Sequence, residues 1–261
     1  MTRIFITGSS DGLGFLAGVE LVEQGHTVVF HARTEAKAIA LKTKVRSCEA
    51  IVVGDVSTID GMSDVAAQVN RLGRFDAIIH NVAVGAYESR VLTCDGITQL
   101  FAVNVVAPYI LTALIEQPKR LIYLSSDMHA GGNENLDDPQ WQRRLWNSTQ
   151  AYSDTKLYDL VLAMYVARRW PRVLVNALDP GWVPTRLGGV AAPGDLKDGA
   201  ATQVWLAVSD EPSANVSGRY FYHQKPQQSK RAAARHEVQE RLVAYLERLT
   251  QIRIPFGDGP L

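Results

Sequence analysis

Residues 3–14 read "RIFITGSSDGLG", an apolar run of strand length that ends in a glycine-rich segment. Three glycines, Gly8, Gly12 and Gly14, lie in this segment, and a helical pattern of apolar residues follows directly. Glycine lets the backbone turn sharply and approach a pyrophosphate, which then lies at the N-terminus of the next helix. The stretch therefore predicts a strand, a phosphate-binding turn and a helix. Its GxxxGxG spacing differs from the usual GxGxxG fingerprint, so a plain glycine-rich turn is the alternative.

Strand and helix patterns alternate along the rest of the 261 residues without a linker or a repeat. The first six expected strands are almost entirely apolar, as strands covered on both faces of a parallel sheet are. The pattern predicts one doubly wound α/β domain over residues 1–261, although length alone would also allow two small domains. We expect strands over residues 3–8, 26–33, 49–55, 75–81, 119–126, 172–181 and 218–222. We expect helices over roughly residues 13–24, 35–46, 58–71, 96–116, 147–169, 198–208 and, amphipathic and C-terminal, 232–250.

Two irregular stretches interrupt this alternation. Residues 127–147 are long and polar and contain two tryptophans, and residues 186–199 are rich in glycine. Each follows the C-terminal end of an expected strand, where open α/β sheets bind ligands. Because long loops in a compact domain are usually functional or disordered, we expect both to border a substrate site. The second loop is also a candidate lid over a bound cofactor.

The composition argues against several classes of protein. The 27 basic residues balance the 27 acidic ones, so no net field attracts nucleic acid or a membrane surface. The cysteines, Cys48 and Cys94, predict reduced thiols, and the six histidines show no metal-binding spacing. No apolar run reaches the roughly 18 residues that span a bilayer, and the N-terminus starts directly with a strand. We expect a soluble, cytoplasmic protein without a metal site, in which the sequons at Asn147 and Asn215 mean little.

Residues 151–170, "AYSDTKLYDLVLAMYVARRW", place Tyr152 and Lys156 four residues apart in an expected helix. This spacing is about one turn, so both side chains share one face. Free tyrosine has a pKa near 10, and a neighbouring ammonium stabilises the phenolate and lowers that pKa toward the range useful for acid–base catalysis. We expect Lys156 to act on Tyr152 in this way. A surface pair without a role is the alternative.

Three motifs together resemble the short-chain dehydrogenase/reductase family. They are TGxxxGxG at residues 7–14, YxxxK at residues 152–156 and "PGWVPT" at residues 180–185. The glycine spacing is similar to that of the shorter, non-extended branch. The segments "SSDMHAGG", "AYSDTKL" and "SGRYF" resemble retinol-dehydrogenase-like members most closely. The resemblance implies an NAD(P)-binding oxidoreductase with a Rossmann-type fold, in which helices cover both faces of a mostly parallel, seven-stranded sheet.

The resemblance also implies a set of cofactor contacts. Asn81 matches the second asparagine of the family's NNAG motif, whose other letters are His80, Val82 and Ala83 here. That change affects the fit of the cofactor more than the chemistry. The implied contacts are Gly8, Ser10, Gly12, Leu13 and Gly14 at the pyrophosphate, Asp55 and Val56 at the adenine, Asn81 behind the cofactor, and Tyr152, Lys156, Pro180, Gly181, Val183 and Thr185 at the nicotinamide end.

A catalytic set follows from the same resemblance. Ser126 is the second serine of the pair that ends the fifth expected strand, and it would hydrogen-bond the substrate oxygen. Asn104 matches the helix asparagine that holds a water in a proton relay to Lys156. Tyr152 would then exchange a proton with the substrate oxygen while a hydride passes between the nicotinamide and a carbonyl carbon.

The second expected strand bears on the choice of cofactor. A protein that binds NAD usually places an acid at its end, whereas an arginine there suits the 2′-phosphate of NADP. This chain has Arg33 there, with His31 as a possible second contact, so we favour NADP(H) over NAD(H). Asp11 argues against this choice, because its charge would repel a phosphate. A surface role for Arg33 is the alternative.

Substrate and assembly are less defined. With NADP(H), which the cytosol keeps reduced, we expect reduction of a ketone or aldehyde, or oxidation of the matching alcohol. Trp141, Trp146, Trp182, Met128 and Leu187 predict an apolar small molecule as substrate. The alternatives are a non-catalytic NADP sensor and a scaffold without cofactor. Family members commonly pair through the helices that carry the catalytic asparagine and tyrosine, so a homodimer or homotetramer is plausible unless the C-terminal helix covers that surface.

Overall fold

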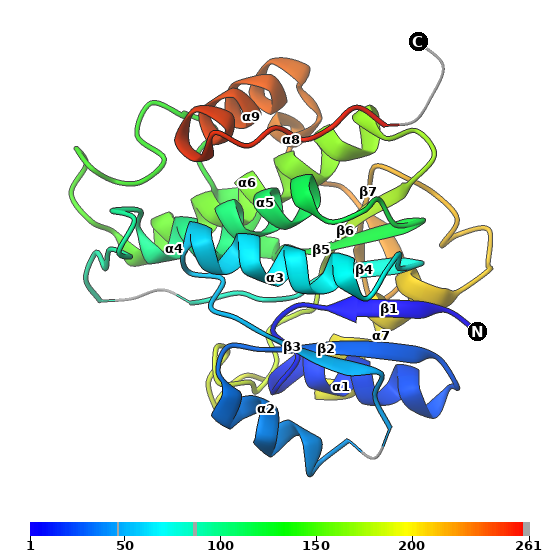
Figure 1. Cartoon of the computed structure of the whole chain (residues 1–261). Helices are drawn as coiled ribbons and strands as arrows, with labels where there is room; N and C mark the ends of the chain where they lie inside the picture. Colours follow the sequence, from blue (N-terminus) through cyan, green and yellow to red (C-terminus); the bar gives the residue numbers. More distant parts are fainter. Residues whose placement is uncertain (46, 86–87, 258–261) are drawn as a thin grey trace.

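The computed structural model in Figure 1 describes residues 1–45, 47–85 and 88–257. Within this range all strands belong to one sheet, in the order β3-β2-β1-β4-β5-β6-β7-β8. Strands β1 to β7 run parallel, and β8 pairs antiparallel with β7. The strands are β1 (Arg3–Ile6), β2 (Thr27–Ala32), β3 (Ala50–Val53), β4 (Ala77–His80), β5 (Arg120–Leu124), β6 (Leu174–Asp179), β7 (Arg219–Tyr222) and β8 (Lys225–Gln227).

Helices cover both faces of the sheet (Figure 1). Alternate residues of β1 serve the two layers, because Ile4 and Ile6 pack toward α1 and α7 while Phe5 packs toward α3, α5 and α6. The helices are α1 (Gly12–Glu23), α2 (Glu35–Lys42), α3 (Ile59–Arg71), α4 (Gln99–Phe101), α5 (Ala107–Leu114), α6 (Ser148–Arg169), α7 (Leu196–Val208), α8 (Arg231–Ala234) and α9 (His236–Thr250). A π-helical turn, Ala102–Val106, joins α4 to α5, and a 3-10 helix, Asp127–Gly131, follows β5.

The strand order reverses at β1, which pairs with β2 on one side and β4 on the other. The helices that follow β1 and β4 therefore lie on opposite faces of the sheet, and the carboxyl ends of these two strands meet where the order reverses. Ligands of doubly wound sheets bind at this kind of reversal. The expected doubly wound fold, with a mostly parallel sheet and helices on both faces, is confirmed.

The expected number of strands was too small by one. The chain reverses between β7 and β8 through His223 and Gln224, which both have positive φ, 48° and 61°. A two-residue turn with two positive φ values matches the twist of a hairpin, and glycine or asparagine usually fills it. Neither residue is present here, so the sequence contained no hairpin signal. Pro226 suits β8 because this strand lies at the sheet edge.

Several helix boundaries also differ from the expected ones. The helix expected over 96–116 is divided by the π-helical turn, and the one over 232–250 is divided at Arg235. Helix α7 begins at Leu196, inside the expected loop 186–199. Helix α2 ends at Lys42, and residue 46 of the expected helix 35–46 lies outside the described residues, as do residues 258–261 of the expected domain.

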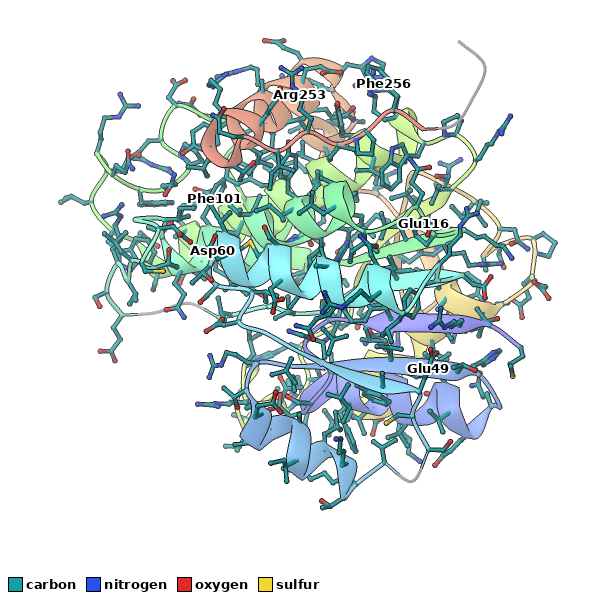
Figure 2. The ribbon with its side chains drawn as sticks, in the orientation of Figure 1. Glu49, Asp60, Phe101, Glu116, Arg253 and Phe256 are labelled. Carbon is teal, nitrogen blue, oxygen red and sulfur yellow. The ribbon has the colours of Figure 1, made fainter. Side chains whose placement is uncertain are left out.

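The C-terminal part of the chain packs on α5 and α6. Phe101, labelled in Figure 2, lies at the end of α4. Its ring meets those of Tyr158 in α6 and Tyr245 in α9 edge-on, with ring centroids 6.2 and 5.8 Å away. Beyond α9, the tail is held by two bonds: the Tyr109 hydroxyl donates to the Ile252 carbonyl, and the Trp170 indole donates to the Pro255 carbonyl. The outer surface of α6 is thus covered by the chain itself.

Candidate active site

The glycine turn after β1 is shaped by two close approaches. Gly8 has a φ of +61°, and a Cβ there would lie 2.9 Å from the Cα of Val82. A Cβ on Gly14 would lie 2.3 Å from the Asn81 amide nitrogen. Gly12 also has a positive φ, but its missing Cβ would meet open space. Two of the three glycines are therefore needed for packing against the end of β4, while the third leaves room above the turn.

The N-terminus of α1 fits an anion. Asp11 occupies the N-cap position, but its side chain accepts no hydrogen bond from the first turn. It instead pairs with Lys37 of α2, at 2.6 Å. The first N–H groups of α1 therefore have no side-chain cap, and the space beside Gly12 is open. This cradle suits the pyrophosphate of a dinucleotide. Ser10 and Leu13, expected to contact the cofactor, lie in the same turn and are half-buried.

Asn81 ties the end of β4 to this turn. Its amide nitrogen donates to the carbonyls of Thr7 and Gly8, at 2.9 and 3.1 Å. The Thr7 hydroxyl in turn accepts from the backbone N–H groups of Asn81 and Val82. The altered NNAG motif thus still braces the glycine turn. His80 faces away from it, into a buried contact with Thr112.

The residues after β2 divide into a structural one and an exposed one. His31 is buried, its Nδ1 accepts from the Gly8 N–H, and its Nε2 lies 2.9 Å from the Gly54 carbonyl. Burial lowers the pKa of this imidazole. The suggestion that His31 assists a phosphate is therefore wrong, because one ring nitrogen contacts the glycine turn and the other contacts the backbone after β3. Arg33 is exposed directly after β2, two residues before α2 begins.

Beyond β3, Asp55 is exposed and accepts a hydrogen bond from the Ser57 N–H at 2.9 Å. Val56 beside it is buried in the core. The two residues lie at the carboxyl edge of the sheet, as an adenine site would require. The resemblance assigns Asp55 and Val56 to the adenine, and the exposed Asp55 carboxylate is accessible to such a ligand.

Tyr152 and Lys156 are not a surface pair. Tyr152 is 9% exposed and Lys156 only 3%, and the ammonium lies 5.8 Å from the centre of the Tyr152 ring. The Lys156 ammonium donates to the carbonyl of Leu124 at the end of β5, at 2.7 Å. The Lys156 ammonium therefore lies close to the Tyr152 phenol ring, at the end of β5. A buried lysine is costly, and this one is held by specific contacts.

The serine pair after β5 has two distinct functions. Ser125 is buried, and its hydroxyl donates to the carbonyl of Lys156 at 2.9 Å, which fixes β5 against α6. Ser126 is half-buried; its hydroxyl donates to the Asp127 carboxylate at 3.1 Å and accepts from the Met128 N–H. Ser126 is therefore held at the site next to the strand end that Lys156 contacts.

Asn104 lies inside the π-helical turn and is buried. Its amide oxygen accepts from the Val84 N–H, and its amide nitrogen donates to the Val84 carbonyl and to the Thr155 hydroxyl. Thr155 directly precedes Lys156. The side chain expected to hold a water thus joins the loop after β4 to the catalytic helix, and single π-helical turns are frequent at functional sites.

The charges around Tyr152 correct one expectation. Burial raises the pKa of its phenol above the ordinary value, and the carboxylates of Asp179, Asp159 and Asp127 raise it further. In the protein without cofactor, burial and these carboxylates therefore outweigh the expected lowering of the Tyr152 pKa by Lys156. Negative charge close to the phenol opposes the phenolate. The phenol is kept protonated at neutral pH.

Lys156 has a buried acidic neighbour that motif reasoning missed. Asp159 lies three residues further along α6 and is 3% exposed. Burial raises the pKa of Asp159, to about 7, and the charge of Lys156 opposes this shift. Burial lowers the pKa of Lys156, and Asp159 and Asp179 oppose it. The i,i+3 spacing of lysine and aspartate in a helix was the available signal.

The turn after β6 is built on Asp179, whose carboxylate accepts from the Gly181 N–H at 2.8 Å. Gly181 has a φ of +79°, which favours glycine. Thr185 donates its N–H to the Val183 carbonyl, and its hydroxyl accepts from the Gly188 N–H. Pro180 lies between the two turn-forming residues and borders the cavity described next. All of these residues lie at the carboxyl edge of the sheet.

A cavity of about 1070 Å³ opens off this edge. Its wall combines carboxylates with aromatic rings. The carboxylates are Asp127, Asp179, Asp195 and Asp198, and the rings include Trp182, Tyr220, Tyr222, His129 and His223.

Apolar surface lies elsewhere around Tyr152. Leu100, Trp141 and Ala151 form a cluster with Tyr152, and Val84, Met128 and Trp146 pack against it. Trp182 and Leu187, expected in an apolar pocket, are 62% and 47% exposed instead. The Trp182 indole donates to the Gly188 carbonyl within its own loop. The expected apolar pocket is therefore divided into a cluster around Tyr152 and an exposed rim.

Neither a metal-binding cluster nor a membrane-spanning helix is present in the part of the chain that the structure describes. Across residues 1–45, 47–85 and 88–257, no group of three or more histidine, cysteine or acidic side chains is arranged to hold a metal. In the same residues, no helix combines the length and apolar content that crossing a membrane requires.

Comparison with known proteins agrees with this geometry. The short chain dehydrogenase family matches residues 2–119. A short-chain dehydrogenase of Gibberella zeae is 37% identical over 98% of this chain and 99% of its own length. The chain belongs to the short-chain dehydrogenase family. An uncharacterized oxidoreductase of Emericella nidulans is 41% identical over 98% of this chain and its whole length.

Two further likenesses extend the comparison. Human retinol dehydrogenase 13 is 28% identical over 97% of this chain and 85% of its own length, which agrees with the expected retinol-dehydrogenase-like type. A solved structure of an uncharacterized protein from Mycobacterium Paratuberculosis has a TM-score of 0.85, at 24% identity, and covers 98% of this chain and 96% of its own. The short-chain dehydrogenase is thus an oxidoreductase enzyme that uses a nicotinamide cofactor and acts on small molecules. This finding favours an enzyme over the sensor and the scaffold.

Proposed function

We propose that this short-chain dehydrogenase uses NADPH to reduce a ketone or aldehyde. The observation that carries this proposal is the buried Lys156 one turn from Tyr152, where the ends of β5 and β6 meet and Ser126 lies alongside. A tyrosine phenol is protonated at neutral pH and can therefore act as a proton donor, which is the reductive direction. The reverse reaction, oxidation of the alcohol, uses the same groups.

The proposed catalytic set is Ser126, Tyr152, Lys156 and Asn104. When bound, the nicotinamide would supply the hydride that reaches the carbonyl carbon. Tyr152 donates its proton to the carbonyl oxygen, and Ser126 polarises that oxygen once its hydroxyl turns from Asp127 toward the substrate. Lys156 stabilises the phenolate that remains. Asn104 keeps the π-helical turn in contact with Thr155 and so keeps Lys156 in place.

The preference for NADP rests on two cations. Arg33 is exposed at the end of β2, where a 2′-phosphate would lie, and a guanidinium binds phosphate bidentately. Asp11, which argued against NADP, is neutralised by Lys37. Lys37 therefore removes the repulsion that Asp11 would exert, and Arg33 supplies the positive charge for the phosphate. The remaining cofactor contacts are proposed as expected from the resemblance, including Asp55, Val56, Asn81, Val183 and Thr185.

Titration with NADPH and, separately, NADH tests the cofactor. We expect tight NADPH binding that weakens about 10- to 100-fold in Arg33→Ala, the loss of a charge-assisted contact, with NADH binding unchanged. Lys42→Ala, which removes an exposed cation from the last turn of α2, is the matched control. Preference for NADH in the wild type would contradict the choice of NADP.

Turnover tests the catalytic set. We expect Tyr152→Phe to lower kcat about 1000-fold without weakening cofactor binding, because only proton transfer is lost. Tyr165→Phe, more than three turns further along α6, is the control. Equal loss in both variants would point to helix damage instead.

The proposed enzyme is a monomer in the cytoplasm rather than a homodimer or homotetramer. Helix α9 and the tail after it cover α6, and the Tyr109 and Trp170 bonds hold this tail in place. Light scattering during size-exclusion chromatography would test assembly, and the mass of two or four chains would contradict the proposal of a monomer.

The loops at 127–147 and 186–199 are proposed to border the substrate, with the second as a lid.

A further inference from the structure

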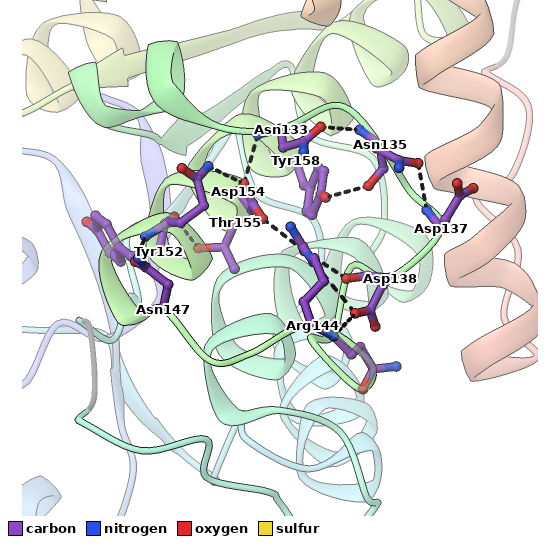
Figure 3. Close-up of polar contacts among 12 residues, drawn as sticks. Asn133, Asn135, Asp137, Asp138, Arg144, Asn147, Tyr152, Asp154, Thr155 and Tyr158 are labelled. Carbon is purple, nitrogen blue, oxygen red and sulfur yellow. Dashed lines mark hydrogen bonds and ion pairs between the residues drawn. The ribbon is translucent and has the colours of Figure 1, made fainter.

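The segment between the 3-10 helix and α6 is organised around one buried carboxylate. Asp138 accepts hydrogen bonds from the backbone N–H groups of Gln142, Arg143 and Arg144, at 2.7, 3.0 and 3.0 Å. These bonds close the turn that carries Trp141. Figure 3 shows Asp138 and Arg144 facing each other across this turn. The turn is therefore a defined structure and not a loose connection.

Arg144 joins this turn to the catalytic helix. Its guanidinium donates to the Asp138 carbonyl at 2.9 Å and to the Asp154 carboxylate at 3.2 Å. Asp154 is fully buried and also accepts from the Asn133 N–H and the Gln150 amide, both at 2.8 Å (Figure 3). Asp154 lies in α6 between Tyr152 and Lys156. The loop is thus attached to the helix inside the catalytic motif.

The same guanidinium also holds an aromatic ring. Arg144 lies 3.8 Å from the centre of the Trp141 ring. Trp141 is 6% exposed, meets Trp146 edge-on with centroids 5.9 Å apart, and belongs to the apolar cluster of Tyr152. Trp141 thus shares an apolar cluster with Tyr152, and Arg144 links Trp141 to Asp154. Asp154 and Tyr152 are two residues apart in α6, so these links form a closed ring of contacts, called the circuit below.

This circuit is costly, which argues against a purely structural origin. Trp141 has a φ of +56°, a left-handed conformation that bulky residues rarely adopt. Asp154 is buried while the Arg144 side chain is 32% exposed, and an ion pair with a buried member often stabilises a fold no more than apolar residues of the same volume would. Strain together with buried charge next to a catalytic residue is the usual sign of a position fixed for function.

We propose that Arg144 and Asp154 are positioning residues that hold Trp141 as an aromatic wall beside Tyr152, so that the enzyme prefers carbonyl compounds with a planar aromatic group. The inference rests on the proposed carbonyl reduction at Tyr152. An indole face stacks on a flat ring better than on a puckered one of equal size. The wall acts by shape, because the Trp141 N–H is buried and, in the part of the chain that the structure describes, has no hydrogen-bond partner.

Two ketones of nearly equal size test the wall. Acetophenone has a planar ring and cyclohexyl methyl ketone a puckered one. Their binding would be measured by calorimetry in the presence of NADP⁺, and their kcat and KM with NADPH. We expect the wild type to bind acetophenone at least 10-fold more tightly. Trp141→Phe should keep this preference and Trp141→Leu should lose it.

The tether is tested by Arg144→Met and Asp154→Asn. Each should raise KM for acetophenone about 10-fold, change KM for the other ketone little, and leave NADPH binding intact. The double variant should lose no more than either single one, because both remove the same contact. Arg143→Met, in the same turn but without a contact to α6, is the control.

The outcomes separate this inference from the proposed function. Preferential binding of acetophenone without turnover would support the wall and contradict the proposed reaction. Equal binding of both ketones, or of neither, would overturn the wall. Folded variants that lower kcat equally for both ketones would also overturn it, since the tether would then act on Tyr152 itself.

Discussion

The turn at residues 8–14 and the loop at residues 132–147 border the same proposed active site but are fixed in opposite ways. In the turn, glycines allow the backbone of β1 to approach the end of β4, so the shape depends on side chains that are missing. In the loop, buried carboxylates collect backbone N–H groups, so the shape depends on side chains that are present. A missing side chain leaves a spacing that can be seen in sequence. A buried carboxylate leaves none, because its partners lie at irregular distances along the chain.

The largest expected effect comes from adding one methyl group to the turn. Gly14→Ala would place a Cβ 2.3 Å from the Asn81 amide nitrogen. We expect the free energy of unfolding to fall by about 3 kcal/mol and cofactor binding to weaken about 100-fold, since overpacking must shift the turn. Calorimetric titration with NADPH would measure it. Gly131→Ala, whose Cβ would meet nothing closer than 3.9 Å, is the control. Undiminished binding would show that the turn does not depend on its missing side chains.

The next effect lies at His80, a polar residue that is buried at the end of β4, directly before Asn81. Burial lowers the pKa of its imidazole to about 3, below the ordinary value of 6.5. The unfolded chain therefore binds one more proton between these pH values, and the stability from His80 is lost as the pH falls below about 6.5. The slope is about 1.4 kcal/mol per pH unit.

His80→Phe should flatten this slope. The ring contact with Tyr123, at 4.9 Å between centroids, is kept, while the titrating group is removed. Urea unfolding at pH 6.5 and pH 4.5 should show about 2 kcal/mol less loss in the variant than in the wild type. Equal losses in both proteins would mean that His80 is protonated in the folded state.

The sequence predicted the parts that repeat or that depend on glycine. Periodic apolar patterns placed seven strands and the main helices, and glycine and YxxxK spacings placed the turn and Tyr152. His31 was misassigned because its partners, Gly8 and Gly54, are brought to it only by the neighbouring strands. The contact of Arg144 with Asp154 spans a loop and a helix start, so no helical period announces it. The π-helical turn at Asn104 likewise depends on contacts with Val84 and Thr155.

A smaller effect is expected in the loop itself. Asp138→Asn keeps the volume but replaces one acceptor oxygen by a donor that faces backbone N–H groups. We expect a loss of about 2 kcal/mol in unfolding free energy at pH 7. Asp137→Asn is a matched control, because the Asp137 carboxylate pairs with Arg241 at the surface and its loss should cost less than about 0.5 kcal/mol. If both substitutions cost the same, the loop is not fixed by its buried carboxylate.

The smallest effect concerns the hairpin that the sequence did not announce. Gln224 has a φ of 61°, which costs a residue with a side chain about 1 kcal/mol and glycine nothing. Gln224→Gly removes this strain but adds freedom to the unfolded chain, so we expect a net gain of only about 0.5 kcal/mol. The bond from the backbone N–H of residue 224 to the Thr202 hydroxyl does not depend on the side chain. Differential scanning calorimetry would measure the shift. A loss of stability would mean that the Gln224 side chain supports β8, and that this hairpin, like the loop, is fixed by what its residues carry.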